Sequence, residues 1–298
     1  MFPLVLALLA GLSWGSADFV GGIMTKRLAT ATVLLVSQGA GLAFIASLVF
    51  VLGEPRPEAR FLVLGGLGGL AGAIGLASLY KGLAVGQMSV VAPTAALSGS
   101  VPVLVGFVQG ERPAPLQLAG MLIAGIGIVL AVRGSAGTGA PVAAGPDLAV
   151  VPAGAHRSSR PVAAGIGYAL SAALFLGLLV TSLDAAGRAG PLWASMMVRI
   201  VSVPLFVAAW LFRGGARRPP RGREVATLAM VGLADNGANV LFAIAAREGL
   251  LTLVSVLGSL YPVSTVLLAR VFLHERLARV QAAGVVAAFA GVVLIAAG

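Results

Sequence analysis

Long runs of apolar residues follow one another along the whole chain and are separated by short polar or charged segments. A helix needs about 20 mostly apolar residues to cross the hydrocarbon of a bilayer. Several runs, such as 28–53, contain no charged residue. The pattern predicts an all-α integral membrane protein with about ten transmembrane helices, at about residues 3–24, 28–53, 61–81, 86–109, 115–132, 161–183, 191–212, 225–246, 250–273 and 280–297.

Composition removes the main alternatives to a membrane protein. The 298 residues are 59% hydrophobic and 10% charged, and they include no cysteine. A soluble domain is about 45–50% apolar and about 25% charged, so an ordinary soluble enzyme and a disordered chain are both excluded. The absence of cysteine excludes disulfide scaffolds and Cys-ligated metal sites. Since the two histidines, His156 and His274, fall in or beside predicted loops, we expect neither a metal nor a cofactor.

An internal repeat divides the chain into two halves. Residues 134–160 are rich in Gly, Pro, Ala and Ser and predict a linker between a first repeat, 1–133, and a second, 161–298. A motif in the first half recurs in the second at a constant offset of 164 residues; it comprises Glu111, Arg112, Gln117, Gly120 and Gly127, matched by Glu275, Arg276, Gln281, Gly284 and Gly291. Each half holds about five helices, and an odd number places the second copy upside down. Inverted repeats are a common construction of secondary transporters.

The excess of basic residues bears on orientation. The chain has 20 Lys and Arg against 10 Asp and Glu, and most basic residues lie in short loops such as 213–224. Such clusters set membrane orientation, and no nucleic-acid-binding module is recognisable. If ten helices are right, the side with more positive charge is cytoplasmic and both termini lie outside.

Three charged residues fall within predicted spans: Asp18, Arg199 and Asp235. A charge at a helix centre costs about 2.5–3.5 kcal/mol on insertion scales, so such residues usually face a cavity or a partner. Asp18 follows Trp14 by four residues and shares its helix face. This pair suits an apolar or aromatic ligand with a cationic group. The alternative is a packed Trp14 with Asp18 simply near the helix end.

Asp235 shares a face with Asn239 in the most polar stretch of any apolar run. These two side chains are predicted to bind substrate, and Asp18 and Asp235 to carry a coupling proton. A purely interhelical hydrogen-bond cluster is the alternative. Arg199 either binds a carboxylate with two parallel hydrogen bonds or neutralises Asp18 or Asp235 as an ion pair.

Weaker candidates complete the predicted substrate site. They are polar or amphipathic groups within or near spans, for which packing with one hydrogen bond is the alternative role: Gln38, Tyr80, Ser98 and Tyr261. Pro102 and Pro262 are expected to break their helices and to free carbonyl groups for a cavity, or else only to bend them.

The sequence contains no motif that predicts an enzyme. Gly11–Gly15 has the G-x-S-x-G spacing of a nucleophile elbow, but that motif needs a strand, a turn and a histidine base, whereas here it lies within an apolar helix. No G-x4-G-K-[ST] phosphate loop is present. The chain is therefore not expected to be an enzyme.

Each half resembles an EamA-type repeat of the drug/metabolite transporter superfamily. The resemblance rests on residues 11–16 (GLSWGS), Tyr261-Pro262 and the repeated Glu-Arg…Gln…Gly…Gly pattern. It covers essentially the whole chain. The first half departs from the family pattern because Ser98 stands where the proline would be and Pro102 follows one turn later. Members of the family are commonly drawn with both termini in the cytoplasm, which conflicts with the charge distribution.

The resemblance implies a secondary transporter, an exporter or exchanger of small metabolites such as amino acids or drug-like compounds, working by alternating access in the cytoplasmic membrane. It also implies that helices 1, 3, 4, 6, 8 and 9 line the cavity. Expected partners are the lipid bilayer, a small-molecule substrate and a proton or counter-substrate, with no nucleic acid and with the chain as a monomer or homodimer. A passive channel and a non-transporting scaffold are the alternatives.

Overall fold

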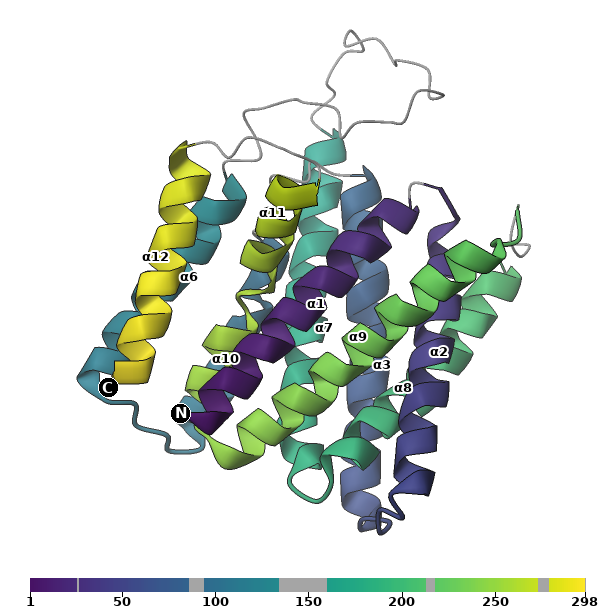
Figure 1. Cartoon of the computed structure of the whole chain (residues 1–298), viewed down its shortest axis with the longest axis horizontal. Coiled ribbons are helices and arrows are strands. Elements are labelled where there is room, and N and C mark those ends of the chain that lie inside the picture. The colour runs from purple at the N-terminus through teal and green to yellow at the C-terminus, as the bar shows by residue number, and fades with distance from the viewer. Residues whose placement is uncertain (26, 86–93, 134–159, 213–217, 273–278, 298) are drawn as a thin grey trace, which may run out of the picture.

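The computed structural model describes residues 1–25, 27–85, 94–133, 160–212, 218–272 and 279–297, and these residues form helices and loops with no strand. Figure 1 shows the helices packed side by side, with α6 and α12 together at one edge. The elements are α1 (Phe2–Thr25), α2 (Thr30–Val51), α3 (Ala59–Val85), η1 (Ala96–Gly99), α5 (Ser100–Val108), α6 (Pro115–Arg133), α7 (Arg160–Gly187), α8 (Pro191–Phe212), α9 (Gly222–Glu248), α10 (Leu251–Gly258), α11 (Tyr261–Phe272) and α12 (Arg279–Ala297).

Six of these helices are long and apolar enough to cross a membrane: α1, α2, α3, α7, α8 and α9. Shorter apolar helices lie at Leu97–Val108, Pro115–Leu130 and Ala282–Ile295. The prediction of an all-helical, multi-pass membrane protein is confirmed. Helix length and composition account for six membrane crossings, and the count of ten is part of the proposed function.

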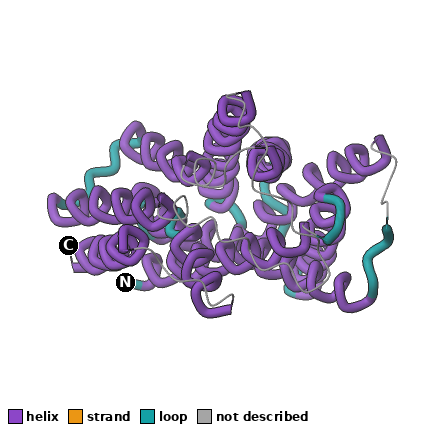
Figure 2. Tube along the Cα trace, turned by 90° about the horizontal axis from the view of Figure 1, so that it is seen from above, coloured by secondary structure: helices purple, strands orange, loops and turns teal. Residues whose placement is uncertain are grey.

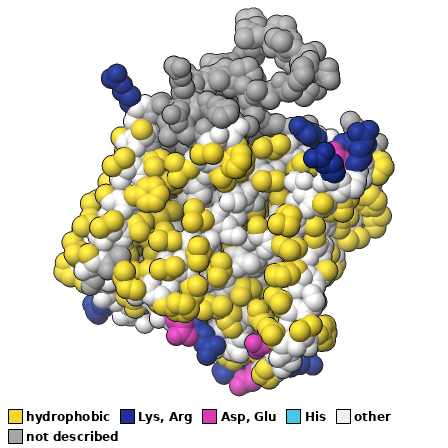
Figure 3. Space-filling model, in the orientation of Figure 1, with side chains coloured by type: hydrophobic (Ala, Val, Ile, Leu, Met, Phe, Trp, Pro, Cys, Tyr) yellow, Lys and Arg dark blue, Asp and Glu magenta, His cyan; other side chains and the backbone are white. Residues whose placement is uncertain are grey.

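The outer surface is apolar where a soluble protein would be polar. Large hydrophobic side chains point outward, among them Leu122 at 70% exposure and Val286 at 68%. On the face drawn in Figure 3, hydrophobic side chains cover the middle, and the charged ones gather toward the upper and lower ends. A surface of this kind is stable against lipid, because lipid tails match its apolar side chains.

Two of the predicted spans are broken. The ninth apolar run divides into α10 and α11, and the break falls at Ser259 and Leu260, directly before Tyr261 and Pro262. A proline near the start of a helix loses nothing, because its missing N–H has no partner in the first turn. The fourth run contains the short 3-10 turn η1 and then α5, with Pro102 as the third residue of α5. The first residues of that run, 86–93, lie outside the described part of the chain.

The contacts between helices follow a two-fold pattern, in which a contact made by a helix of the first half has a counterpart made by the equivalent helix of the second half. Helix α1 packs on α9 and α7 packs on α3, while α2 packs on α9 and α8 packs on α3. Likewise α1 contacts α10 and α11, and α7 contacts η1 and α5. Two contacts join equivalent helices directly, α6 with α12 and α2 with α8. The view in Figure 2 shows the same bundle from above.

The glycines of the repeated motif explain the contact between α6 and α12. A Cβ atom added at Gly120 would lie 2.8 Å from the Gly291 carbonyl oxygen, and one at Gly127 would lie 2.8 Å from that of Gly284. The two backbones therefore approach as closely as small residues allow. Close approach of this kind is how helices associate in lipid, where no hydrophobic effect drives them together.

The glutamate of the repeated motif joins the two halves. Glu111 follows α5, and its Oε1 accepts a hydrogen bond from the backbone N–H of Leu251 at 2.7 Å, while its Oε2 accepts one from that of Thr252 at 2.8 Å. A carboxylate at a helix N-terminus satisfies donors that have no intrahelical partner and interacts favourably with the helix dipole. The matching residues Glu275 and Arg276, and residues 134–159 of the predicted linker, lie outside the described part of the chain.

Candidate functional site

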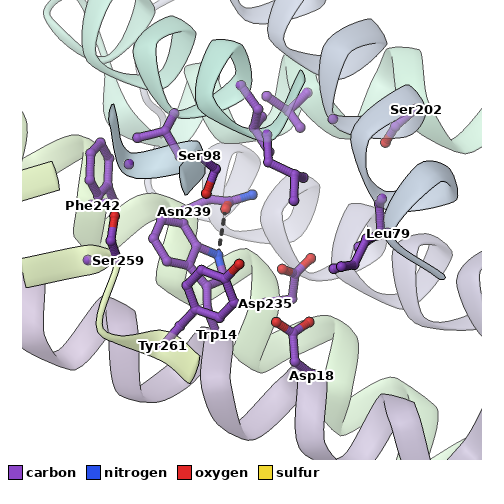
Figure 4. A pocket seen from close by; sticks show the side chains of 18 of the residues that line it. Trp14, Asp18, Leu79, Ser98, Ser202, Asp235, Asn239, Phe242, Ser259 and Tyr261 are labelled. Carbon is purple, nitrogen blue, oxygen red and sulfur yellow. Dashed lines mark hydrogen bonds between the residues drawn. The ribbon is translucent and has the colours of Figure 1, made fainter. Parts of the chain in front are cut away.

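A cavity lies in the middle of the bundle, between residues of both halves. Its volume is about 90 Å³, which is of the same order as the engineered cavity of about 150 Å³ that binds benzene, so it suits a compact ligand. The lining residues are Trp14, Asp18, Gln38, Gly72, Leu76, Leu79, Ser98, Gly99, Leu176, Leu179, Val180, Val198, Arg199, Ser202, Asp235, Asn239, Phe242, Ser255, Gly258, Ser259 and Tyr261. Figure 4 shows how the labelled side chains converge on this space.

Arg199 of α8 lies at the centre of a buried polar network on one wall. Its Nη2 donates to Asp235 Oδ2 at 2.7 Å, its Nε donates to Asn236 Oδ1 at 2.9 Å, and its Nη1 donates to Gln38 Oε1. The Gln38 amide in turn donates to Asp235 Oδ2 at 3.0 Å. Three helices, α2, α8 and α9, are joined by these bonds. Of the two roles predicted for Arg199, the geometry provides the ion pair with Asp235.

A glycine lets α2 and α9 approach each other beside this guanidinium group. A Cβ atom added at Gly41 of α2 would lie 3.0 Å from the carbonyl oxygen of Gly232 and 3.6 Å from Nε of Arg199. The close approach of α2 and α9 at this point lets the arginine reach partners on both helices. The side chain of Arg199 is only 5% exposed, whereas that of Asp235 is 25% exposed and faces the cavity.

Aromatic side chains form a second wall. The Trp14 indole N–H donates to Asn239 Oδ1 at 3.0 Å, and the Trp14 ring lies 5.6 Å from that of Phe242 at an interplanar angle of 37°. Tyr261, the first residue of α11, lines the same cavity as Trp14, and its side chain overlaps that of Trp14 in the view of Figure 4. The hydrogen bond to Asn239 fixes the orientation of the indole, so that the wall is rigid and amphipathic.

Asp18 stands one helical turn from Trp14 and lines the cavity. Its carboxylate and that of Asp235 point into the same space in Figure 4. Among the described residues, Asp18 makes no hydrogen bond and no ion pair. It differs in this respect from Asp235, which is paired with Arg199.

Several buried side-chain donors have no protein partner, and three of them belong to residues that line the cavity. Among the described residues, these are Ser202 Oγ, Asn236 Nδ2, Asn239 Nδ2, Thr252 Oγ1 and Ser255 Oγ. Leaving such a group unpaired costs about 1–3 kcal/mol, and so buried polar groups are usually satisfied by protein, water or ligand. Because Ser202, Asn239 and Ser255 are also lining residues, the cavity favours a polar occupant over a purely apolar one.

The structure brings together most of the residues that the sequence singled out. Eight of the nine candidates line the cavity: Trp14, Asp18, Gln38, Ser98, Arg199, Asp235, Asn239 and Tyr261. Tyr80 is outside the lining. It packs against the cluster formed by Leu34, Ala73 and Phe206, because it lies on α3 one residue after Leu79, and adjacent helical residues point in different directions.

Other lining residues were not predicted. Phe242, Ser255 and Ser259 line the cavity, although a phenylalanine and two serines in apolar runs carry no sequence signal beyond ordinary packing. The first, third, fourth, sixth, eighth and ninth predicted helices, which the family resemblance implied, correspond to α1, α3, η1 with α5, α7, α9, and α10 with α11. All six contribute to the lining. Two further helices also contribute, α2 through Gln38 and α8 through Arg199. Among the described residues of α6 and α12, none lines the cavity.

A cavity with ionisable side chains in its wall, set among apolar, membrane-length helices, is the architecture of a multi-pass membrane transporter. Comparison with known sequences gives the family. A sequence model of the EamA-like transporter family matches residues 1–133 and 163–297. The chain belongs to the EamA-like transporter family, within the drug/metabolite transporter group.

Comparison with solved structures supports the fold. One of them, titled only as the crystal structure of a protein, superposes with a TM-score of 0.77 over 99% of this chain and 98% of its own. The two sequences are 18% identical, so this likeness is one of fold alone. No curated protein matches the sequence.

Proposed function

We propose that the protein is a secondary active transporter that exports or exchanges a small metabolite, such as an amino acid or a drug-like compound, across the cytoplasmic membrane by alternating access. The observation that carries this proposal is the central cavity, in which Asp18, Arg199 and Asp235 meet inside an otherwise apolar helical bundle. Ionisable groups at membrane depth typically mark substrate or ion pathways.

The proposal includes ten membrane crossings in two inverted five-helix repeats. It is supported by the packing of the helices, in which the contacts of α1 and α2 with α9 have counterparts in those of α7 and α8 with α3. In transporters built from inverted repeats, substrate sites lie near the midplane at the interface of the repeats, often beside interrupted helices. A site of this kind is supported by the wall of the cavity, which includes Ser259 at the break between α10 and α11 and Tyr261 directly after it.

Transport then requires two global states in which the cavity opens to opposite sides. Asp18 and Asp235 are the groups that we assign to proton coupling, if a proton drives the cycle. Asp18 is the better placed of the two, because Asp235 already accepts hydrogen bonds from Arg199 and Gln38. The chain is proposed to act as a monomer or a homodimer with a proton or counter-substrate as its second ligand.

The test is flux into proteoliposomes that contain the purified protein. A panel of amino acids, nucleosides and organic cations would be offered with and without an imposed pH gradient. We expect saturable uptake of at least one compound, and acceleration by the gradient if protons are coupled. A non-saturating flux would indicate a channel, and folded protein that moves no member of the panel would contradict the transport proposal.

A matched pair of tryptophan variants makes this test specific for the cavity. Ser98→Trp fills the cavity wall, whereas Leu122→Trp changes a side chain of α6 that is 70% exposed on the apolar surface. We expect the first variant to lose saturable uptake and the second to retain it. Monodisperse elution and an unchanged unfolding temperature would show that each variant is folded.

A further inference from the structure

The charges of the cavity do not balance. Its lining contains two carboxylates, Asp18 and Asp235, and one guanidinium, Arg199. Two phenols, those of Tyr80 and Tyr261, are close enough to Asp18 to interact with it electrostatically, but a phenol is uncharged at neutral pH. With both carboxylates ionised, the described lining residues therefore carry one uncompensated negative charge.

The positive charge of Arg199 is not free to hold a substrate anion. Each of its three guanidinium nitrogens already donates a hydrogen bond, to Asn236, Gln38 and Asp235. The side chain is 5% exposed. A carboxylate ligand would have to displace Asp235 from this pair and would then meet the carboxylate of Asp18. The arrangement therefore disfavours substrate anions.

The uncompensated carboxylate lies where a cation would be held best. Asp18 has no hydrogen-bond or ionic partner among the described residues, and Asp235 uses only its Oδ2 toward Gln38 and Arg199. Both carboxylates point into the cavity beside Trp14 and Tyr261 (Figure 4). An ammonium group placed there gains charge-assisted hydrogen bonds from the acids and cation–π attraction from the rings.

The rest of the cavity defines the remainder of the ligand. Trp14 and Phe242 present a fixed aromatic surface, and leucines of α3 and α7 close the opposite side. These walls suit a short apolar or aromatic body.

We infer that the cavity binds a small protonated amine without a carboxylate, with its ammonium group at Asp18 and its apolar body against Trp14 and Phe242. This inference rests on the proposed transport function and narrows its substrate class. Amino acids and organic anions are then poor ligands, since the described lining residues offer their carboxylates no free cation.

The test compares three ligands that share one phenyl ring and differ in charge: 2-phenylethylamine, phenylalanine and 3-phenylpropionate. Titration calorimetry with the protein in zwitterionic nanodiscs, and with empty nanodiscs as blank, measures binding without interference from passive membrane permeation. We expect the amine to bind at least tenfold more tightly than the other two. Equal or tighter binding of phenylalanine or 3-phenylpropionate would overturn the inference, as would no binding of the amine.

Variants locate the ammonium group. Asp18→Asn should weaken binding of 2-phenylethylamine at least tenfold, Asp18→Glu should retain most of it, and Glu58→Gln, at an exposed pair with Arg60, should leave it unchanged. Amine binding that is unaffected by Asp18→Asn would overturn the assignment to Asp18. If that variant does not fold, the comparison of the three ligands on the wild-type protein still tests whether the cavity prefers an amine without a carboxylate. The carrier proposal fails separately, only if the wider flux panel is not transported.

Discussion

At the scale of single residues, the ion pair of Arg199 and Asp235 has structural consequences as well as functional ones. Its partners lie on three helices, and the guanidinium is almost fully buried. Burying an ion pair gains little over apolar packing, but removing one partner leaves an uncompensated buried charge and costs about 3–5 kcal/mol. The pair therefore constrains how α2, α8 and α9 move relative to one another.

We predict that Arg199→Met lowers the free energy of unfolding by about 3 kcal/mol, since Asp235 is then left with a single donor, Gln38. The double variant with Asp235→Asn should recover part of this loss. Denaturant unfolding in detergent micelles, followed by tryptophan fluorescence, measures both. Glu58→Gln removes an exposed ion pair with Arg60 and should have no measurable effect. An Arg199→Met protein as stable as the wild type would refute the argument.

At the same scale, the sequence was informative about the site because charge is costly in lipid. Asp18, Arg199 and Asp235 stand out in apolar runs for this reason, and all three line the cavity. The sequence could not assign partners, because whether Arg199 meets Asp18 or Asp235 depends on how α1, α8 and α9 pack. Tyr80 shows the same limit, since one helical position separates it from Leu79 in the lining.

At the scale of the elements, the cap that Glu111 provides for α10 links helices from opposite halves. Both of its carboxylate oxygens accept backbone hydrogen bonds, and hydrogen bonds to a charged group contribute about 1.5–3 kcal/mol each. The repeated motif pointed to Glu111, but its partner is 140 residues away in the sequence. A contact of that range cannot be predicted from local pattern.

Graded substitution of Glu111 tests the cap. Glu111→Gln keeps one carbonyl acceptor but loses the charge, and Glu111→Ala loses both acceptors. We expect unfolding free energies in the order wild type, then Gln, then Ala, with the last reduced by about 2–3 kcal/mol. Glu58→Ala, an exposed acid, is the control. Equal stability of the wild-type and alanine proteins in denaturant titrations would show that the cap is dispensable.

At the scale of the whole molecule, the two halves meet along α6 and α12. Most of the architecture was visible in the sequence, because runs of apolar residues predict helices and the lengths of α1, α2, α3, α7, α8 and α9 suit a membrane. The glycines that permit α6 and α12 to pack together belong to the motif repeated in the two halves. The sequence alone, however, did not predict that these two helices are partners. Small residues mark an interface without naming the partner.

Two alanine substitutions on α6 test this interface. A Cβ atom at Gly127 would collide with the backbone of Ala288, whereas one at Gly125 would meet nothing within 4 Å. We predict that Gly127→Ala lowers the free energy of unfolding by about 1–3 kcal/mol and that Gly125→Ala leaves it equal or slightly higher. Thermal and denaturant unfolding in micelles would show the difference. Indistinguishable variants would mean that α6 and α12 separate readily.

The contact of α6 and α12 has one more consequence, for the thermodynamics of movement. Its nearest atoms are mostly those of the backbone and of the small residues Gly120, Ala124, Gly127, Gly284, Ala288 and Gly291, together with the side chain of Ile295. Glycine and alanine have no rotamer freedom to lose when they are packed, so this contact forms with little ordering of side chains. Separating the two helices would give up close backbone packing and would regain little side-chain entropy. We therefore expect α6 and α12 to stay together and to move as one unit when the rest of the bundle rearranges.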